Sequence, residues 1–114
     1  NKSTVSVPEG LSAAQEAQAI VGDSVRVVSA FQNISYLKLR NPETDIDCDG
    51  LVTGDDVEAK SEVMQLVVAA GMKGIDVGPL ANAIVAEALA PALIYINKTY
   101  KIKDAGIRIT GIED

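Results

Sequence analysis

The sequence of 114 residues contains no histidine and no tryptophan, and its only cysteine is Cys48. The absence of histidine excludes Ser–His–Asp and Cys–His triads, acid–base catalysis by an imidazole, and histidine-ligated metal sites. A single cysteine excludes a disulfide within the chain and a zinc site built from cysteines. Any chemistry must therefore use carboxylates, lysines or backbone groups, or belong to a cofactor that the protein positions.

Aromatic residues and positive charge are also scarce. Only 4% of the residues are aromatic, so the core has to be built from alanine, valine, isoleucine and leucine. The 10 basic residues against 16 acidic ones give a net charge of −6, which argues against a nucleic-acid partner. With 47% hydrophobic residues, residues 1–114 suit one soluble domain. The chain begins Asn1-Lys2-Ser3 without a secretory signal, and we expect a domain of a longer protein.

Helix and strand signals alternate along the chain. The alanine-rich residues 11–22 predict a helix that Ser12 begins and Gly22 ends. The apolar run 25–31 predicts a strand that is covered on both faces. Further strands are expected at 45–53, 74–78 and 106–112, and further helices at 55–70 and 80–97. This order predicts an α/β or α+β fold, with a small sheet, flanking helices and a long, mostly apolar C-terminal helix.

The segment 80–97 is the most unusual part of the chain. Asn82 and Glu87 are its only strongly polar residues before Asn97, so the expected helix must be buried on several sides. A membrane span is the rival interpretation, since the apolar length approaches the roughly 20 residues required. Glu87, Pro91 and the many alanines argue against it. We therefore expect no membrane contact and instead a partner surface, a second copy of the chain that forms a homodimer through helix 80–97.

The stretch 45–56 matches the template of a calcium-binding loop. Acids stand at loop positions 1, 3 and 5, glycine at 6, an aliphatic residue at 8 and an acid at 12. Converging carboxylates suit a hard cation, but Asp56 is shorter than the glutamate that chelates with both oxygens, and Pro42 interrupts the entering helix. The alternative is a strand whose Asp47 and Asp49 point to solvent, running into a capped helix.

Three further features each allow a structural and a functional interpretation. Glu87 is either a functional acid or a carboxylate bonded across an interface, and the structural role is favoured. Cys48 is expected to be a small packed hydrophobe, because no adjacent base could activate its thiol. Gly78-Pro79 before a helix either presents backbone N–H groups to an anion or carbonyl, or is a plain strand-to-helix turn.

Three blocks of sequence occur in the order and spacing of one known family. They are residues 27–35 (VVSAFQNIS), 76–83 (DVGPLANA) and 104–110 (DAGIRIT). Together they resemble the C-terminal half of the F420-dependent NADP oxidoreductases, the NADPH:F420 reductases, and the likeness runs from about Ser12 to the end. The cytosolic domains of transmembrane ferric reductases are more distantly similar and share the Asp-x-Gly-x-Leu turn.

The resemblance implies the C-terminal part of a two-part, Rossmann-type enzyme. Its cofactors would be F420 and NADP, hydride would pass directly between their rings, and no protein residue would act as a catalyst. The N-terminal Rossmann domain that binds NADP is missing here, and the chain has no G-x-G-x-x-G, so we expect it to be inactive alone. The family also implies a cytoplasmic homodimer with helix 80–97 as the contact. The expected F420-binding residues form three groups: Asn33, Ile34 and Ser35; Gly78, Pro79 and Leu80; and Ala105, Gly106 and Ile107.

Other functions stay open on the sequence alone. One is a calcium-binding module centred on residues 45–56, and another is a purely structural dimerisation domain. A relative that prefers flavin to deazaflavin is a third outcome.

Overall fold

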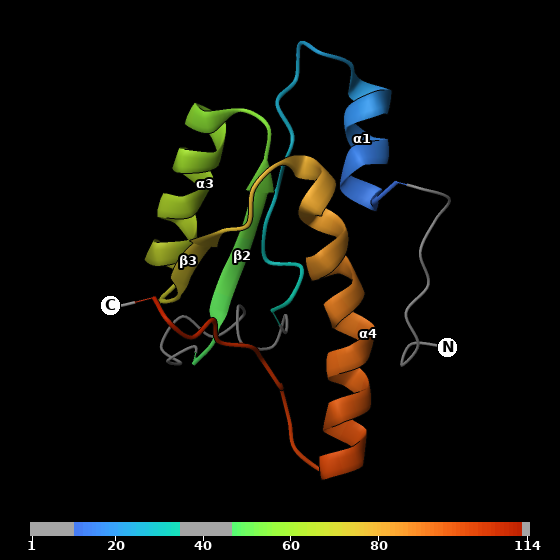
Figure 1. The fold of residues 1–114 in the computed structure, drawn as a ribbon, viewed down its shortest axis with the longest axis vertical. Coiled ribbons are helices and arrows are strands. Elements are labelled where there is room, and N and C mark those ends of the chain that lie inside the picture. The colour runs from blue at the N-terminus through green and yellow to red at the C-terminus, as the bar shows by residue number, and fades with distance from the viewer. Residues whose placement is uncertain (1–10, 35–46, 113–114) are drawn as a thin grey trace.

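The computed structural model describes residues 11–34 and 47–112. Within these ranges the chain forms three α-helices, a short 3₁₀ helix and a three-stranded sheet (Figure 1). In chain order the elements are α1 (Ala13–Val21), β1 (Val28–Ser29), β2 (Asp49–Gly54), α3 (Val57–Ala69), β3 (Lys73–Asp76), η1 (Leu80–Asn82) and α4 (Ala83–Tyr100). The expected mixed α/β fold with a long C-terminal helix is confirmed.

The sheet is mixed and has the strand order β1-β2-β3. β1 pairs with β2 antiparallel, and Ser29 lies opposite Thr53. β2 and β3 run parallel, with Leu51 opposite Ile75, and α3 connects them. Two parallel strands need a crossover of this kind, and the connecting helix covers one face of the sheet.

Two glycines let α3 pack closely on its face of the sheet. Gly50 of β2 and Gly74 of β3 are partners in the parallel register. A Cβ atom on Gly50 would lie 2.6 Å from Cγ1 of Val67, and one on Gly74 would lie 3.0 Å from Cε of Met64. Only residues without a side chain leave room for these α3 side chains. The buried cluster between α3 and the sheet contains Ile34, Cys48, Val52, Val67 and Met72, which confirms Cys48 as a packed hydrophobe.

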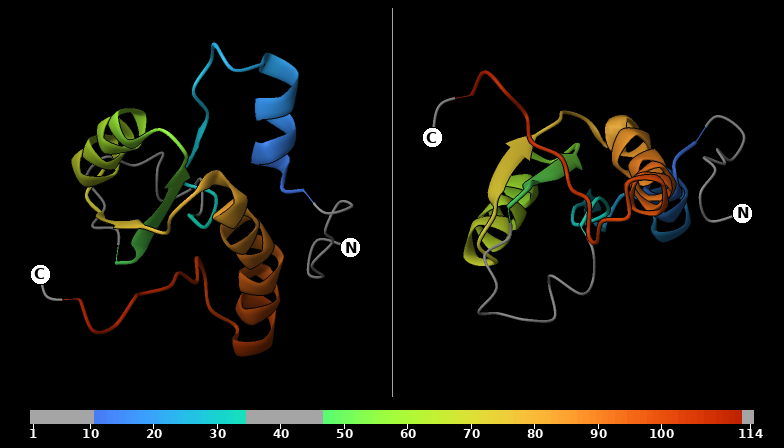
Figure 2. Two further views of the ribbon diagram at one scale, coloured as in Figure 1. Left: turned by 45° about the horizontal axis from the view of Figure 1, so that its top comes forward. Right: turned by 90° about the horizontal axis from the view of Figure 1, so that it is seen from below.

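α4 covers the opposite face of the sheet (Figure 2). Leu51 and Ile75 pack there against Ala86 in a second buried cluster. Successive side chains of a strand point to opposite faces, so neighbouring residues of β2 contribute to different clusters. Pro79 precedes η1 in an extended conformation, as a proline at a helix start prefers, and α4 then runs through Pro91.

α1 lies beside the N-terminal part of α4 (Figure 1). Ser12 is its N-cap and Gly22 its C-cap, so both expected ends of the helix are confirmed. The carboxylate of Glu87 in α4 accepts hydrogen bonds from the backbone N–H groups of Ala13 and Ala14, at 2.7 and 3.2 Å. Glu87 therefore has the structural role that was favoured, because it satisfies two amides at the start of α1.

The strand expected at 25–31 is shorter than predicted and consists of β1 alone. The side-chain amide of Gln18 accepts from the N–H of Val27 at 3.1 Å and donates to the carbonyl of Val25 at 2.7 Å. These backbone groups are thus bonded to α1 and are not available to a sheet. On the other side of β1, Phe31 has a φ of 65°, which is incompatible with a strand.

The strand expected at 106–112 is wrong. Residues 102–112, the return segment, leave the end of α4 and run back to the start of β2 without forming a strand (Figure 1). The carbonyl of Ile107 accepts from the N–H of Asp49 at 2.8 Å, as in a ladder. The ladder of backbone hydrogen bonds does not continue beyond this pair. The N–H of Ile109 donates instead to the carboxylate of Asp49 at 2.7 Å, so a side chain takes the place of a backbone acceptor.

α4 begins and ends three residues later than predicted, and it is less buried than predicted. It ends at Tyr100, and within the described chain only Ala83, Ala86 and Leu93 are buried in it. By length and composition, η1 and α4 together could cross a membrane, and 22% of the most apolar stretch is enclosed by the rest of the protein. A single helix of this length and composition is weak evidence for a membrane span. The exposed apolar side chains of α4 are Val85, Tyr95, Ile96 and Tyr100.

Candidate functional site

A largely apolar cavity of about 420 Å³ lies beside the C-terminal half of α4. Three segments form its walls: the loop after β1, α4 itself and the return segment. Their lining residues are Phe31, Gln32, Asn33 and Ile34 of the loop, Ala90, Leu93, Ile94 and Asn97 of α4, and Asp104 and Ala105. Small-molecule sites typically have volumes of about 300–1,000 Å³ and are mostly apolar with a few fixed polar groups. This cavity has both properties.

The cavity brings together residues from two of the three groups that the sequence predicted. Asn33, Ile34 and Ala105 all line it, although 71 residues separate Ile34 from Ala105 in the chain (105 − 34). Gly106, which follows Ala105, is exposed. Ile107 packs against the cluster under α4 instead. Ser35 lies outside the described residues.

Asn33 forms part of the wall but its amide is used by the sheet. The side chain is 2% exposed, and its Nδ2 donates to the carbonyl of Asp49 at 2.8 Å. Its Oδ1 accepts from the N–H of Leu51 at 3.4 Å. One amide therefore replaces a neighbouring strand along the first half of β2 and fixes the loop that carries Phe31 and Ile34 against the sheet.

Backbone strain is concentrated at the cavity. Among the described residues other than glycine, only Phe31, Lys101 and Asp104 have a positive φ, at 65°, 55° and 57°. Two of these three, Phe31 and Asp104, line the cavity. A bulky residue in this region is uncommon, and such strain persists only where the surroundings enforce it, most often at binding and active sites. The strain is therefore a second, independent indication of a functional site.

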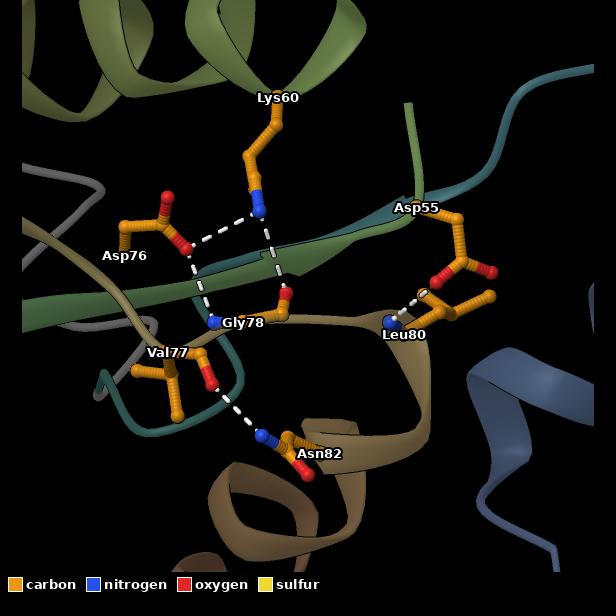
Figure 3. Close-up of polar contacts among 7 residues, drawn as sticks. All are labelled: Asp55, Lys60, Asp76, Val77, Gly78, Leu80 and Asn82. Atoms are coloured by element: carbon orange, nitrogen blue, oxygen red, sulfur yellow. Dashed lines mark hydrogen bonds and ion pairs between the residues drawn. The ribbon is translucent and has the colours of Figure 1, made fainter. Parts of the chain in front are cut away.

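The third predicted group, Gly78, Pro79 and Leu80, does not line this cavity. It forms the turn between β3 and η1 (Figure 3). The N–H of Gly78 donates to Oδ1 of Asp76 at 2.9 Å, and the N–H of Leu80 donates to Oδ1 of Asp55 at 3.0 Å. Since proline has no N–H, the donors that could have bound an anion are already bonded to carboxylates of the same chain. The plain-turn interpretation is favoured.

Lys60 of α3 ties this turn to the rest of the fold (Figure 3). Its Nζ lies 3.1 Å from Oδ1 of Asp76 and donates to the carbonyl of Gly78 at 3.3 Å. The hydrogen bond from the backbone N–H of Gly78, together with the bond from Lys60, holds the pKa of Asp76 below its usual value. On the other side of the turn, Asn82 donates to the carbonyl of Val77 at 2.8 Å. These contacts make a rigid corner rather than an open binding site.

The calcium-loop interpretation does not fit the described residues of that stretch. Residues 49–54 form β2, so they do not wrap around a central point as a calcium loop does. Asp47 is exposed and pairs with Arg108. Asp49 is 6% exposed and bonds to Ile109, so the expectation that it points to solvent is wrong. Within residues 11–34 and 47–112, no group of three acidic or thiol side chains is placed to hold a metal ion.

Sequence reasoning missed seven of the ten residues that line the cavity: Phe31, Gln32, Ala90, Leu93, Ile94, Asn97 and Asp104. Leu93 and Ile94 were placed in the apolar helix, but which of its side chains face inward depends on how α4 sits on the sheet. Phe31 is the only phenylalanine of the chain and follows the β1 region, which was a usable signal. Asn97 is the polar residue that ends the apolar run of the helix, and its position there was also visible.

The fold and the cavity define a small mixed α/β domain with a cavity of the size that small-molecule sites have. A solved structure from Arthrobacter sp. FB24, assigned to the F420-dependent NADP reductases, has the same fold, with a TM-score of 0.76 and 21% identity. That likeness covers 91% of this chain and 50% of the other. At this identity it establishes the fold alone, and it confirms the fold class expected from the sequence.

The particular relatives are three proteins named F420-dependent NADP reductase. The chain is 43% identical over 107 residues to the protein of Methanocaldococcus jannaschii, a match of 93% of this chain and 47% of the relative. Those of Methanothermobacter marburgensis and Methanothermobacter thermautotrophicus are 36% and 35% identical, again over 93% of this chain and 48% and 46% of theirs. The family resemblance drawn from the three sequence blocks is confirmed. The chain spans about half the length of these curated relatives, and no family model matches it.

Proposed function

We propose that this chain is the F420-binding part of an oxidoreductase that transfers hydride between NADP(H) and the deazaflavin coenzyme F420. The observation that carries the proposal is the 43% identity to an F420-dependent NADP reductase over 93% of the chain. NADP would bind mainly to a Rossmann domain outside this chain, which itself has no G-x-G-x-x-G. On the likeness to these reductases, we expect the protein to act in the cytoplasm.

The residues of the cavity fit a planar ring system. Its walls are aliphatic along α4, through Ala90, Leu93 and Ile94, and carry one aromatic side chain, Phe31. Apolar walls favour a flat aromatic ligand, and a fixed amide satisfies the polar edge of such a ring. These apolar walls and side-chain amides are therefore suitable for a deazaflavin, which has an apolar tricyclic ring and carbonyl groups at one end.

In the proposed reaction the bound coenzymes supply the hydride donor and acceptor. The residues of this chain bind the ring, orient it and exclude water. Leu93 and Ile34 line the cavity and are only 7% and 9% exposed, so this part of the wall is apolar and shielded from solvent. The amide of Asn33 and the side chain of Asn97 hold two of the walls in place. Fixed walls keep the reacting ring in one orientation, which is the main contribution a protein makes to direct hydride transfer.

Titration of F420 into the chain, followed by coenzyme fluorescence, tests the proposal. We expect saturable binding with a preference over riboflavin, and loss of binding when Ala90→Leu fills the cavity. Ala69→Leu, an exposed position on α3, is the matched control and should bind like the wild type. Joining an NADP-binding Rossmann domain to the chain should then restore hydride exchange with NADPH. Failure of the wild type to bind F420 would leave the structural dimerisation domain as the better description, and a preference for riboflavin would indicate a flavin enzyme.

We also propose that the outer face of α4 binds a second copy of the chain. Val85, Tyr95, Ile96 and Tyr100 are 37–71% exposed and occupy one side of the helix by their spacing. Apolar side chains gathered in this way usually mark an interaction surface. A self-complementary helix face gives a two-fold homodimer, the commonest oligomer. The alternative occupant is another part of a longer polypeptide.

Sedimentation equilibrium distinguishes these cases. A homodimer has about twice the chain mass of 11.9 kDa, and Tyr95→Lys should give a folded monomer. Val57→Lys, at a 77% exposed position on α3, is the matched control and should stay dimeric. A charge at Leu93 is a poor probe, because Leu93 faces the cavity and its substitution would disturb the fold itself. A monomeric wild type would exclude the homodimer.

A further inference from the structure

The side-chain amide of Asn97 is held in one orientation at the wall of the cavity. Its Oδ1 accepts a hydrogen bond from the backbone N–H of Ala105 at 2.9 Å. A backbone N–H can only donate, so the oxygen of the amide must face it and the NH₂ group must point elsewhere. The backbone carbonyl of Asn97 in turn accepts from the N–H groups of Lys101 and Ile102, which fixes the end of α4 around this residue.

The NH₂ group of Asn97 has no bonding partner within the described ranges 11–34 and 47–112. In Asn33, the other asparagine of the cavity, both the NH₂ group and the oxygen of the amide are hydrogen-bonded to the backbone of β2. Gln32 is exposed and has no comparable anchor. Asp104, when ionised, can only accept. Among the described lining residues, Asn97 is thus the side-chain donor whose position is set before a ligand arrives.

We propose that Asn97 is a binding residue that orients the ring in the cavity, with Nδ2 donating to a ring carbonyl oxygen. The inference rests on the proposed function, because it takes the deazaflavin ring as the ligand. A ring carbonyl that leaves water for an apolar cavity needs a new donor, and an unsatisfied one weakens binding. Because Ala105 fixes the amide, the ring would enter with its carbonyl edge toward the C-terminal end of α4.

A substitution that removes the donor and keeps the acceptor tests this role. Asn97→Asp still accepts from the N–H of Ala105 but places a carboxylate oxygen where the NH₂ group was. We expect it to bind F420 at least about tenfold more weakly than the wild type, with an unchanged circular dichroism spectrum. Gln65→Glu, at an exposed position on α3 that does not line the cavity, is the matched control, since it makes the same change from amide to carboxylate, and we expect its affinity to stay within about twofold of wild type.

A second measurement requires no mutation. In ¹H–¹⁵N spectra of the wild type, saturation with F420 should shift the side-chain NH₂ signals of Asn97 strongly downfield and leave those of Asn33 almost unchanged. Unshifted Asn97 signals at saturation, or wild-type affinity in Asn97→Asp, would overturn the inference. Absence of any F420 binding by the wild type would instead contradict the proposed function, so the two failures are distinguishable.

Discussion

Oε1 of Glu87 lies 2.7 Å from the backbone nitrogen of Ala13, although 74 residues separate the two in the chain. The second oxygen of Glu87 bonds to Ala14. A carboxylate from the N-terminal part of α4 thus binds the free amides at the start of α1, in addition to the N-cap that Ser12 provides. α1 contains no buried residue, so this polar contact has a large share in holding it in place.

Removal of the Glu87 carboxylate should loosen α1 selectively. We expect Glu87→Ala to lower the free energy of unfolding by about 1–2 kcal/mol, the usual effect of losing a helix cap. The amides of Ala13 and Ala14 should exchange with solvent much faster, as hydrogen exchange followed by NMR will show. Glu62→Ala, at an exposed position on α3, is the control and should change neither quantity. Unchanged exchange at Ala13 would show that α1 is held by other contacts.

The close approach of Gly50 and Val67 predicts a strong coupling between these positions. Gly50→Ala would place a Cβ atom 2.6 Å from Cγ1 of Val67, which is completely buried, and overpacking of this kind costs about 1–3 kcal/mol. In the double variant with Val67→Ala the clash disappears. Denaturant titrations of the two single variants and the double variant should therefore give a coupling energy above about 0.5 kcal/mol. Additive effects would mean that the strand shifts instead.

The hydroxyl of Thr53 is the buried side-chain group without a hydrogen-bond partner among the described residues. Thr53 is 2% exposed and lies opposite Ser29 in the sheet. Thr53→Val keeps the shape and removes the unsatisfied group, so we expect the free energy of unfolding to rise by about 1 kcal/mol. Thr53→Ser, which keeps the hydroxyl and loses the methyl group, should lower it. A stabilised serine variant and a destabilised valine variant would reveal a partner for the hydroxyl, such as an ordered water.

The lowered pKa of Asp76 predicts a small loss of stability in acid. The N–H of Gly78 and then Lys60 stabilise the charged form, so the folded pKa is below the ordinary value of 3.8. The contribution of Asp76 is complete well above pH 3.8 and is lost as the pH falls through the folded pKa. The side chain is 55% exposed, so we expect less than about 1 kcal/mol. The difference in unfolding free energy between wild type and Asp76→Asn should shrink from about pH 6 to about pH 2.5.

Local sequence signals predicted the fold where one residue decides the structure. Ser12 and Gly22 bound α1, and Pro79 precedes η1. The errors lie where a side chain replaces a backbone partner. Gln18 shortens the first strand, and Asp49 prevents the last one. Neither replacement is visible in the apolar periodicity, because each is a hydrogen bond between a polar side chain and the backbone.

The site was predicted in part, and the reason is geometric. The resemblance identified Asn33, Ile34 and Ala105, which the fold brings together around one cavity. The contribution of α4 depended on the rotation of the helix about its own axis, which an apolar run does not encode, so Leu93 and Ile94 were not assigned to the cavity. Asn97 needed a tertiary contact, the N–H of Ala105, before its importance was visible.

Asn33 and the return segment do more than form walls of the cavity. Along the first half of β2 they bond to the backbone groups of Asp49 and Leu51 that β1 is too short to reach. If these two covers were lost, an open row of donors and acceptors would be available for strand addition by a neighbouring molecule. The same two segments therefore form walls of the cavity and cover this edge of the sheet, and we expect a variant that displaces either segment to open the cavity and expose the edge together.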